Sequence, residues 1–195
     1  MPNGGAATSV PGGEGVELGT LGLYSIQAGR NDVRSRLHCL SNPCTFKINE
    51  VVVGVASVDA LFHISAEETN ANLEPGSRLR RIAQHLLQQR SYYPLFPPPA
   101  SMPTNLDLKF MEHWQIPCQP DLMIVPSKLT PFVSAIMDNT VAINPGHLGK
   151  GTTGGTYAVL EIHPITRELL ENAGGDDVQL PHAIQDRTRV EIKRI

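Results

Sequence analysis

The sequence predicts a mixed α/β fold, in which a mixed β-sheet is flanked by helices. Short apolar runs of strand length and an amphipathic helical pattern follow one another along the chain. The expected order of elements is hairpin, helix, strand, helix, strand, strand, strand, which fits a mixed sheet with an antiparallel edge. A length of 195 residues suits a domain of ordinary size, and a hydrophobic fraction of 41% is adequate for its core.

The first 37 residues differ from the rest of the chain. Residues 1–37 are rich in Gly, Ala, Ser and Pro and have little periodicity. We therefore expect them to be disordered or poorly packed. Residues 38–195 carry the periodic patterns and are expected to fold.

A hairpin over residues 45–57 is the first expected element, because apolar and polar residues alternate there before a buried run at residues 51–55. Residues 59–63 begin a loop or short helix. A clear helix is expected over residues 77–89, with Ser77 as its N-cap. The apolar face of that helix comprises Leu79, Ile82, Leu86 and Leu87.

The second half of the chain contains most of the expected strands. Residues 106–114 are weakly helical, and short apolar strands are expected at residues 121–125 and 140–143, with an amphipathic segment between them. Alternating patterns predict further strands at residues 155–162 and 190–195, separated by a polar, partly helical excursion.

A proline-rich connection at residues 92–103 holds the best candidate for a recognition surface. Its repeated prolines exclude helix and ladder pairing, and its aromatic side chains are Tyr92, Tyr93 and Phe96. Such residues offer a large contact area at low entropic cost, as at protein interfaces. Internal packing of a long loop is the alternative. Lys150 is a further candidate for partner binding, because it could contact a phosphate or an acidic partner.

Ligands of α/β sheets bind just past the carboxyl ends of strands. The residues in that position after the first apolar strand, 126–129, include no good metal ligand or catalytic base. The glycine-rich turn at residues 146–152 lacks the spacing of a phosphate loop and precedes a strand rather than a helix. We expect a wide turn in which positive φ is adopted by Gly146, Gly149 and Gly151.

The net charge and the positions of the Cys and His residues exclude further classes of function. A net charge of -3 gives no electrostatic footprint for nucleic acid, and three cysteines argue against a disulfide framework and for a reducing compartment. Of seven histidines, only His63 and His147 lie at expected loop positions. No Asp-x-His or His-x-His pattern accompanies them, so we expect exposed or hydrogen-bonded histidines and no metal. No membrane span or secretory signal is visible.

Several motifs occur together and in order, and they closely resemble the B-subunit family of eukaryotic DNA polymerase alpha–primase. The resemblance covers about residues 40–195. The motifs are Asn42-Pro43-Cys44, SVDALFH at 57–63, QRSYYPLFPP at 89–98, NPGHL at 144–148, GGT at 154–156 and the terminal segment 190–195. The resemblance implies a calcineurin-like phosphoesterase domain that has lost catalysis. Residues 38–195 would form its C-terminal half.

The resemblance also implies that the metal-ligand positions are replaced. Active relatives, including the archaeal polymerase D small subunit, use Asn-His-Asp, a lone His and Gly-His-x-His. Here the Asn is kept, and the other positions carry Pro, Cys, Ser, Ser and Leu. We call these six positions of the degenerate site the degenerate positions; in chain order they are Asn42, which is kept, and the replaced Pro43, Cys44, Ser91, Ser127 and Leu129. Pro, Ser and Leu cannot hold two divalent cations about 4 Å apart, and without the cations no hydroxide nucleophile forms at neutral pH.

The implied function is that of a non-catalytic accessory subunit, or a fragment of one, without a cofactor. It would bind the C-terminal region of the polymerase alpha catalytic subunit in the nucleus, reach primase indirectly and meet DNA through the complex. The family's N-terminal domains and the first half of its phosphoesterase domain are absent, so we expect a truncated product with an exposed sheet edge. Two alternatives stay open: a metal-dependent phosphoesterase or nuclease, and an independent protein-binding module that uses residues 92–98.

Overall fold

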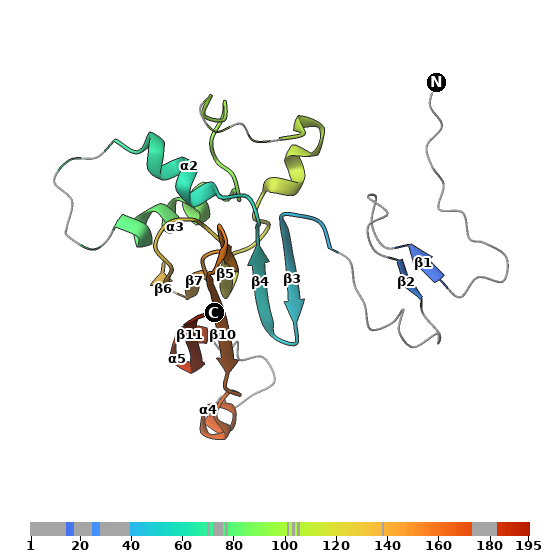
Figure 1. The fold of residues 1–195 in the computed structure, drawn as a ribbon. Coiled ribbons are helices and arrows are strands. Elements are labelled where there is room, and N and C mark those ends of the chain that lie inside the picture. The colour runs from blue at the N-terminus through green and yellow to red at the C-terminus, as the bar shows by residue number, and fades with distance from the viewer. Residues whose placement is uncertain are drawn as a thin grey trace. The chain divides into compact units, whose positions relative to one another are not determined.

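The structure is a computed structural model (Figure 1), and it consists of two compact units, Met1–Ser41 and Asn42–Ile195. It describes residues 15–17, 25–27, 40–69, 71, 76, 78–100, 102, 104, 106–137, 139–172 and 183–195. In the first unit, β1 (Gly15–Glu17) pairs antiparallel with β2 (Ser25–Gln27). Because the rest of residues 1–37 lie outside the described part, disorder or poor packing of that segment stays a prediction.

The second unit is built on a five-stranded sheet with the strand order β3-β4-β5-β7-β6. Its strands are β3 (Cys44–Ile48), β4 (Val51–Val55), β5 (Leu122–Ile124), β6 (Phe132–Ile136) and β7 (Thr140–Asn144). The three central strands β4, β5 and β7 are parallel, whereas β3 and β6 pair antiparallel at the two edges. This mixed sheet with antiparallel edges confirms the predicted fold class.

The local sequence explains the hairpin and the central strands. Asn49 takes a left-handed conformation (φ 53°) in the β3–β4 turn, where asparagine is better tolerated than most residues. β7 is buried along its whole length. A strand covered on both faces has a continuous apolar run rather than an alternating one, as Val141–Ile143 does in the middle of β7.

Two α-helices cover one face of the sheet. Asp59 caps α2 (Ala60–Glu67), because its Oδ1 accepts a hydrogen bond from the Phe62 N–H at 3.0 Å. The expected helix of residues 77–89 is α3 (Arg78–Gln88), and its expected cap Ser77 lies outside the described residues. The weakly helical segment is the 3-10 helix η1 (Leu108–Trp114).

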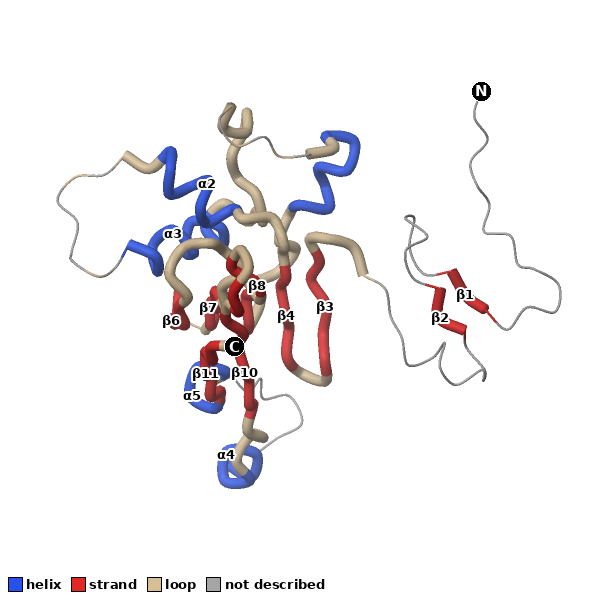
Figure 2. Tube along the Cα trace, viewed as in Figure 1, coloured by secondary structure: helices blue, strands red, loops and turns tan. Residues whose placement is uncertain are grey.

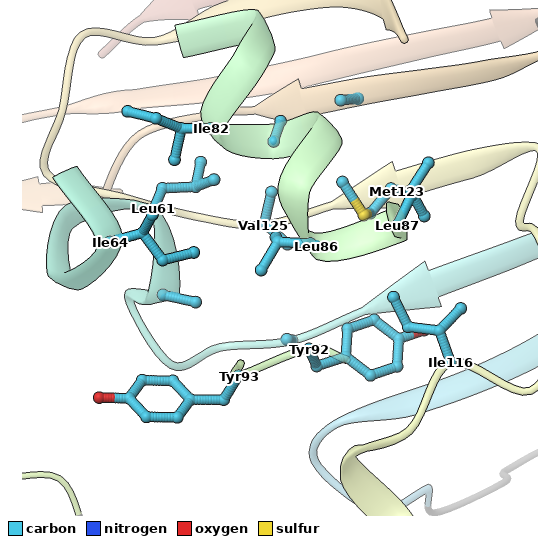
Figure 3. Close-up of a cluster of buried hydrophobic side chains, with 14 of the residues drawn as sticks. Leu61, Ile64, Ile82, Leu86, Leu87, Tyr92, Tyr93, Ile116, Met123 and Val125 are labelled. Atoms are coloured by element: carbon cyan, nitrogen blue, oxygen red, sulfur yellow. The ribbon is translucent and has the colours of Figure 1, made fainter. Parts of the chain in front are cut away.

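The first hydrophobic cluster lies between these helices and the sheet (Figure 3). Ile82 and Leu86 of α3 are fully buried against Met123 and Val125, which belong to β5 and the residue just after it. Since neighbouring residues of a strand point to opposite faces, Leu122 and Ile124 belong to the other face. The apolar face of α3 and one face of the sheet therefore pack together in one core.

The second hydrophobic cluster lies on the other face of the sheet, where Figure 2 shows the backbone of two further strands and a short helix. There β10 (Thr156–Ile162) and β11 (Thr188–Arg194) form a two-stranded antiparallel ribbon next to α5 (Ile184–Arg187). Ile184 is fully buried against the sheet. The sheet is therefore covered by helices on one face and by a ribbon with a short helix on the other. The remaining elements are β8 (Gly149–Lys150), β9 (Thr153–Gly154) and α4 (Arg167–Asn172).

The helix that the predicted order places between the apolar strands at residues 121–125 and 140–143 is not formed, so this prediction is wrong. Strand β6 occupies the segment between the two apolar strands, and it forms a hairpin with β7. Its residues alternate between half-buried or buried and exposed positions, from Phe132 to Ile136. A period of two with Phe, Val and Ile favours a strand, and five residues are too few to establish the helical period instead.

Among the described residues, no helix has both the length and the apolar character needed to cross a membrane.

Candidate functional site

The carboxyl ends of the parallel strands β4, β5 and β7 lie at one edge of the sheet. The loops that leave this edge carry three of the residues singled out from the sequence, Ser127, Leu129 and His147. We call this edge the strand-end edge; it comprises residues 56–59, 125–130 and 145–148.

Asn144, the last residue of β7, holds the strand-end edge together. It is fully buried, and its Oδ1 accepts hydrogen bonds from the backbone N–H of Ser127 at 2.8 Å and of Gly146 at 2.9 Å. Its Nδ2 donates to the carbonyl oxygens of Leu129 and Thr130, both at 3.2 Å. One amide side chain thus satisfies four backbone groups of two neighbouring loops.

Asp59 links the loop after β4 to the loop after β5. While its Oδ1 caps α2, its Oδ2 accepts from the Lys128 backbone N–H at 2.9 Å. The ammonium group of Lys128 in turn lies 3.5 Å from the centre of the Phe62 ring, in cation–π geometry. The loop after β5 is therefore fixed from both sides, by Asn144 and by Asp59.

The structure brings three of the six degenerate positions, Asn42, Ser127 and Leu129, to the strand-end edge. Asn42 precedes β3 and is tied to Ser57, whose N–H donates to the Asn42 Oδ1 at 2.9 Å and whose Oγ accepts from the Asn42 Nδ2. Ser127 is fully buried, and its Oγ accepts from the Leu129 N–H at 3.1 Å. These side chains therefore serve the backbone of the loops that carry them.

The other three positions have different surroundings. Pro43 is buried, and Cys44 begins β3 with a pKa that burial raises above the usual thiol value. Ser91 follows α3, where its Oγ accepts from the Tyr93 N–H at 3.2 Å and its backbone bridges to Gln115. Its contacts are thus to the residues around η1 rather than to the strand-end loops.

The donor atoms at the strand-end edge do not fit a dinuclear metal centre. The Asn42 Oδ1 and the Ser127 Oγ already accept backbone hydrogen bonds, and Leu129 has no ligating side-chain atom. Within the described ranges, His, Cys, Asp and Glu side chains form no group of three or more that could hold a metal ion. At this edge the side chains organise the backbone of the loops, and Lys128 adds one cationic side chain.

The glycine-rich turn is a small hairpin of β8 and β9. Positive φ occurs at Gly146 (76°) and Gly151 (62°) as predicted, but Gly149 lies in β8 without it, so that part of the prediction is wrong. A Cβ on Gly146 would stand 2.2 Å from the Thr156 Oγ1, which explains why glycine is needed at that position. Lys150 is exposed at this hairpin.

Tyr92 and Tyr93 are part of the core, which corrects their assignment to a recognition surface. Their exposed fractions are 2% and 6%, and Figure 3 shows their rings pointing away from each other within the first cluster. The Tyr92 hydroxyl lies 2.6 Å from the Thr45 Oγ1 and donates to the Cys44 carbonyl at 3.2 Å, and burial raises the pKa of Tyr92. The Tyr92 ring fills the space beside β4, where a Cβ on Gly54 would be 2.4 Å from that hydroxyl.

Phe96 is the member of this aromatic group that stays at the surface, with 73% of its area exposed. It lines a groove of about 530 Å³ together with Met111 and Trp114 of η1. Three apolar side chains of η1 are exposed by more than half: Leu108, Phe110 and Met111.

The two histidines expected in loops differ in their surroundings. His63 lies on α2 rather than in a loop, and its Nδ1 is 2.9 Å from the Tyr93 hydroxyl, with the rings edge to face. His147 is exposed in the loop after β7.

Sequence reasoning missed the roles of Asn144 and Asp59. The signals were present, because a polar Asn ends an otherwise buried strand before Pro-Gly, and an Asp directly precedes an apolar helix. Both patterns are typical of side chains that satisfy backbone groups at the ends of elements.

Comparison with known proteins agrees with the resemblance. Residues 24–134, more than half of the chain, match the family described as the B subunit of DNA polymerases alpha and epsilon. The chain is similar to the B subunit of DNA polymerase alpha from Mus musculus, with 43% identity over 127 residues that cover 65% of this chain and 21% of the relative. For the Schizosaccharomyces pombe protein of that name, identity is 38% over 165 residues, 83% of this chain and 28% of the relative.

The protein of that name from Saccharomyces cerevisiae is 28% identical over 187 residues, 79% of this chain and 26% of the relative. The chain spans less than a third of the length of these relatives. The family match, the mixed sheet and the ordered motifs all indicate the same family. The chain belongs to the B-subunit family of DNA polymerases alpha and epsilon.

Proposed function

We propose that this chain acts as a non-catalytic accessory subunit of DNA polymerase alpha in the nucleus, at the initiation of DNA replication. The observation that carries this proposal is the strand-end edge. Its loops are ordered by Asn144 and Asp59, while the side chains that would have to ligate metal ions are engaged with the backbone or lack ligand atoms. The names of the similar proteins support the subunit role.

The proposed partner is the C-terminal region of the polymerase alpha catalytic subunit, with primase reached indirectly and DNA through the complex. The groove beside η1 is the proposed contact, because two exposed large apolar side chains, Phe96 and Met111, line it. Apolar surface of this kind marks protein interaction sites, and aromatic anchors dominate the energetics of interfaces. Phe96 and Met111 are the anchors that we assign to it.

Association of the purified 195-residue chain with that region of the catalytic subunit tests the proposal. Light scattering during size-exclusion chromatography should give a one-to-one complex, and calorimetry should give its affinity. Replacing both anchors (Phe96→Ala with Met111→Ala) should weaken binding about tenfold or more, because truncation of an interface hot spot commonly costs more than 1 kcal/mol.

Ile48→Ala is the matched control, because Ile48 is an apolar β3 side chain with 57% of its area exposed and does not line the groove. Its affinity should stay at the wild-type value. If the anchor variant also binds normally, the groove is the wrong surface. Absence of any complex with a chain that circular dichroism shows to be folded would refute the accessory role.

A further inference from the structure

A second pocket lies beside the strand-end edge and gathers three positively charged side chains. Its volume is about 420 Å³, and it is lined by the loop after β5, the β8–β9 hairpin and the end of β11. Lys128, Lys150 and Arg194 contribute from these three segments, which are far apart in the sequence. All three residues are exposed, and the ammonium group of Lys128 lies over the ring of Phe62, which does not line the pocket.

Within the described part of the chain, the lining of this pocket contains no Asp or Glu, and none of the three cations forms an ion pair. The Asp59 carboxylate bonds to the Lys128 backbone, but its two oxygens accept from main-chain N–H groups of α2 and of Lys128. The main chain of Ile195 borders Gly154, so a terminal carboxylate there would offset one of the three charges. The pocket stays positive in a chain whose net charge is -3.

Five backbone N–H groups in the lining of the pocket are already engaged in hydrogen bonds within the chain. The N–H groups of Ser127, Lys128 and Leu129 donate to Asn144, Asp59 and Ser127 respectively. On the hairpin side, the N–H groups of Gly155 and Thr156 donate to the carbonyls of Leu148 and His147. An anion in the pocket would therefore be held by the long cationic side chains, which bind phosphate as point charges or, for arginine, as a fork.

We propose that this pocket binds the phosphate oxyanions of a nucleic acid strand through Lys128, Lys150 and Arg194. The choice of a strand rests on the proposed function, in which the chain works beside DNA. One wall of the site carries Gly149 and Gly151, and no atom lies within 4 Å of where a Cβ of either would stand, so a phosphodiester backbone can approach this part of the wall closely. No base-specific contact is implied, because phosphate contacts carry no sequence information.

Fluorescence anisotropy with a single-stranded DNA of mixed sequence, about 16 nucleotides long, tests the proposal on the 195-residue chain alone. With three phosphate contacts, the logarithm of the affinity should fall with the logarithm of salt with a slope of about −2, so binding weakens about 20-fold between roughly 50 and 200 mM salt. The double variant Lys150→Gln with Arg194→Gln should lower the affinity and reduce the slope to about −0.7.

Lys47→Gln is the control, because Lys47 is exposed on β3 and does not line the pocket. The double variant and the control should both give the wild-type circular dichroism spectrum. Equal binding by the double variant and the wild type, or an equal loss in the control, would overturn the proposal. So would an absence of DNA binding by the folded wild-type chain at the lower salt concentration.

Competition with ATP and with inorganic phosphate identifies the source of the phosphate. A nucleic acid strand as the ligand is supported if the oligonucleotide binds at least about tenfold more tightly than ATP or inorganic phosphate does. This choice of ligand is overturned if ATP binds as tightly as the oligonucleotide. Because no polymerase subunit is present, this result is independent of the association experiment. Loss of subunit association therefore leaves the pocket measurement interpretable, and the reverse also holds.

Discussion

Asn144 shows how a single residue can decide the geometry of the strand-end edge. Its four hydrogen bonds join the loop after β5 to the loop after β7. Because the residue is fully buried, removing its side chain takes the hydrogen-bond partner from backbone groups that bulk water does not reach in the folded chain. The buried asparagine thus does for these loops what metal ligands would do in an active centre: it fixes their relative positions.

Asn144→Ala should lower the free energy of unfolding by about 3 kcal/mol, because it leaves two buried N–H donors and two carbonyl acceptors without their partner. Urea denaturation followed by circular dichroism measures the change. Asn139→Ala serves as the control at an exposed residue of the neighbouring β6–β7 turn, and it should change stability by less than about 0.5 kcal/mol. Similar small effects for both variants would show that Asn144 does not organise the edge.

At the scale of elements, α2 and α3 are joined by a cluster of charged side chains. The Glu68 carboxylate at the end of α2 accepts from the Arg78 Nε at 2.8 Å and also pairs with Arg81. Arg78 additionally donates to the Ser65 carbonyl at 3.0 Å. The hydrogen bonds from Arg81 and Arg78 hold the pKa of Glu68 below its usual value.

Glu68→Gln should destabilise the chain by about 1 kcal/mol at pH 7, a modest value because Arg78 is half exposed. The lowered pKa means that the unfolded state binds the proton more readily. The stabilisation is therefore present above the ordinary carboxyl pKa of 4.5 and is lost as the pH falls through the lower folded value. Thermal melts of both proteins from neutral pH to about pH 3 should converge at the acid end; a constant difference would contradict the ion-pair explanation.

Most elements could be predicted from the sequence, and the exceptions have physical reasons. The β3–β4 hairpin, α3, β10 and β11 follow from strong periodicity, which local patterns encode directly. Strand β6 could not be predicted, because Phe132–Ile136 is short. Its alternating burial pattern arises only when the segment pairs with β7. The burial of Tyr92 is likewise a tertiary property, since the space for its ring depends on Gly54, far earlier in the chain.

For the whole molecule, the location of the candidate site could be predicted from the sequence, but the full set of residues that form it could not. The rule that ligands bind at the carboxyl ends of parallel strands identified residues 126–129, and the structure puts them at that edge. The positive pocket could not be found, because Lys128, Lys150 and Arg194 come together only when three distant segments pack. The same packing separates Ser91 from the strand-end loops.

The proposed function depends on a strand-end edge that is organised without metal chemistry. The most direct test is Mn²⁺-dependent hydrolysis of a phosphodiester such as bis-p-nitrophenyl phosphate, measured with the 195-residue chain and with His147→Ala. His147 is the exposed histidine of this edge, so a residual metal centre would depend on it. We expect no turnover above the metal-only background for either protein. Manganese-dependent turnover by the wild type that His147→Ala abolishes would contradict the proposed function.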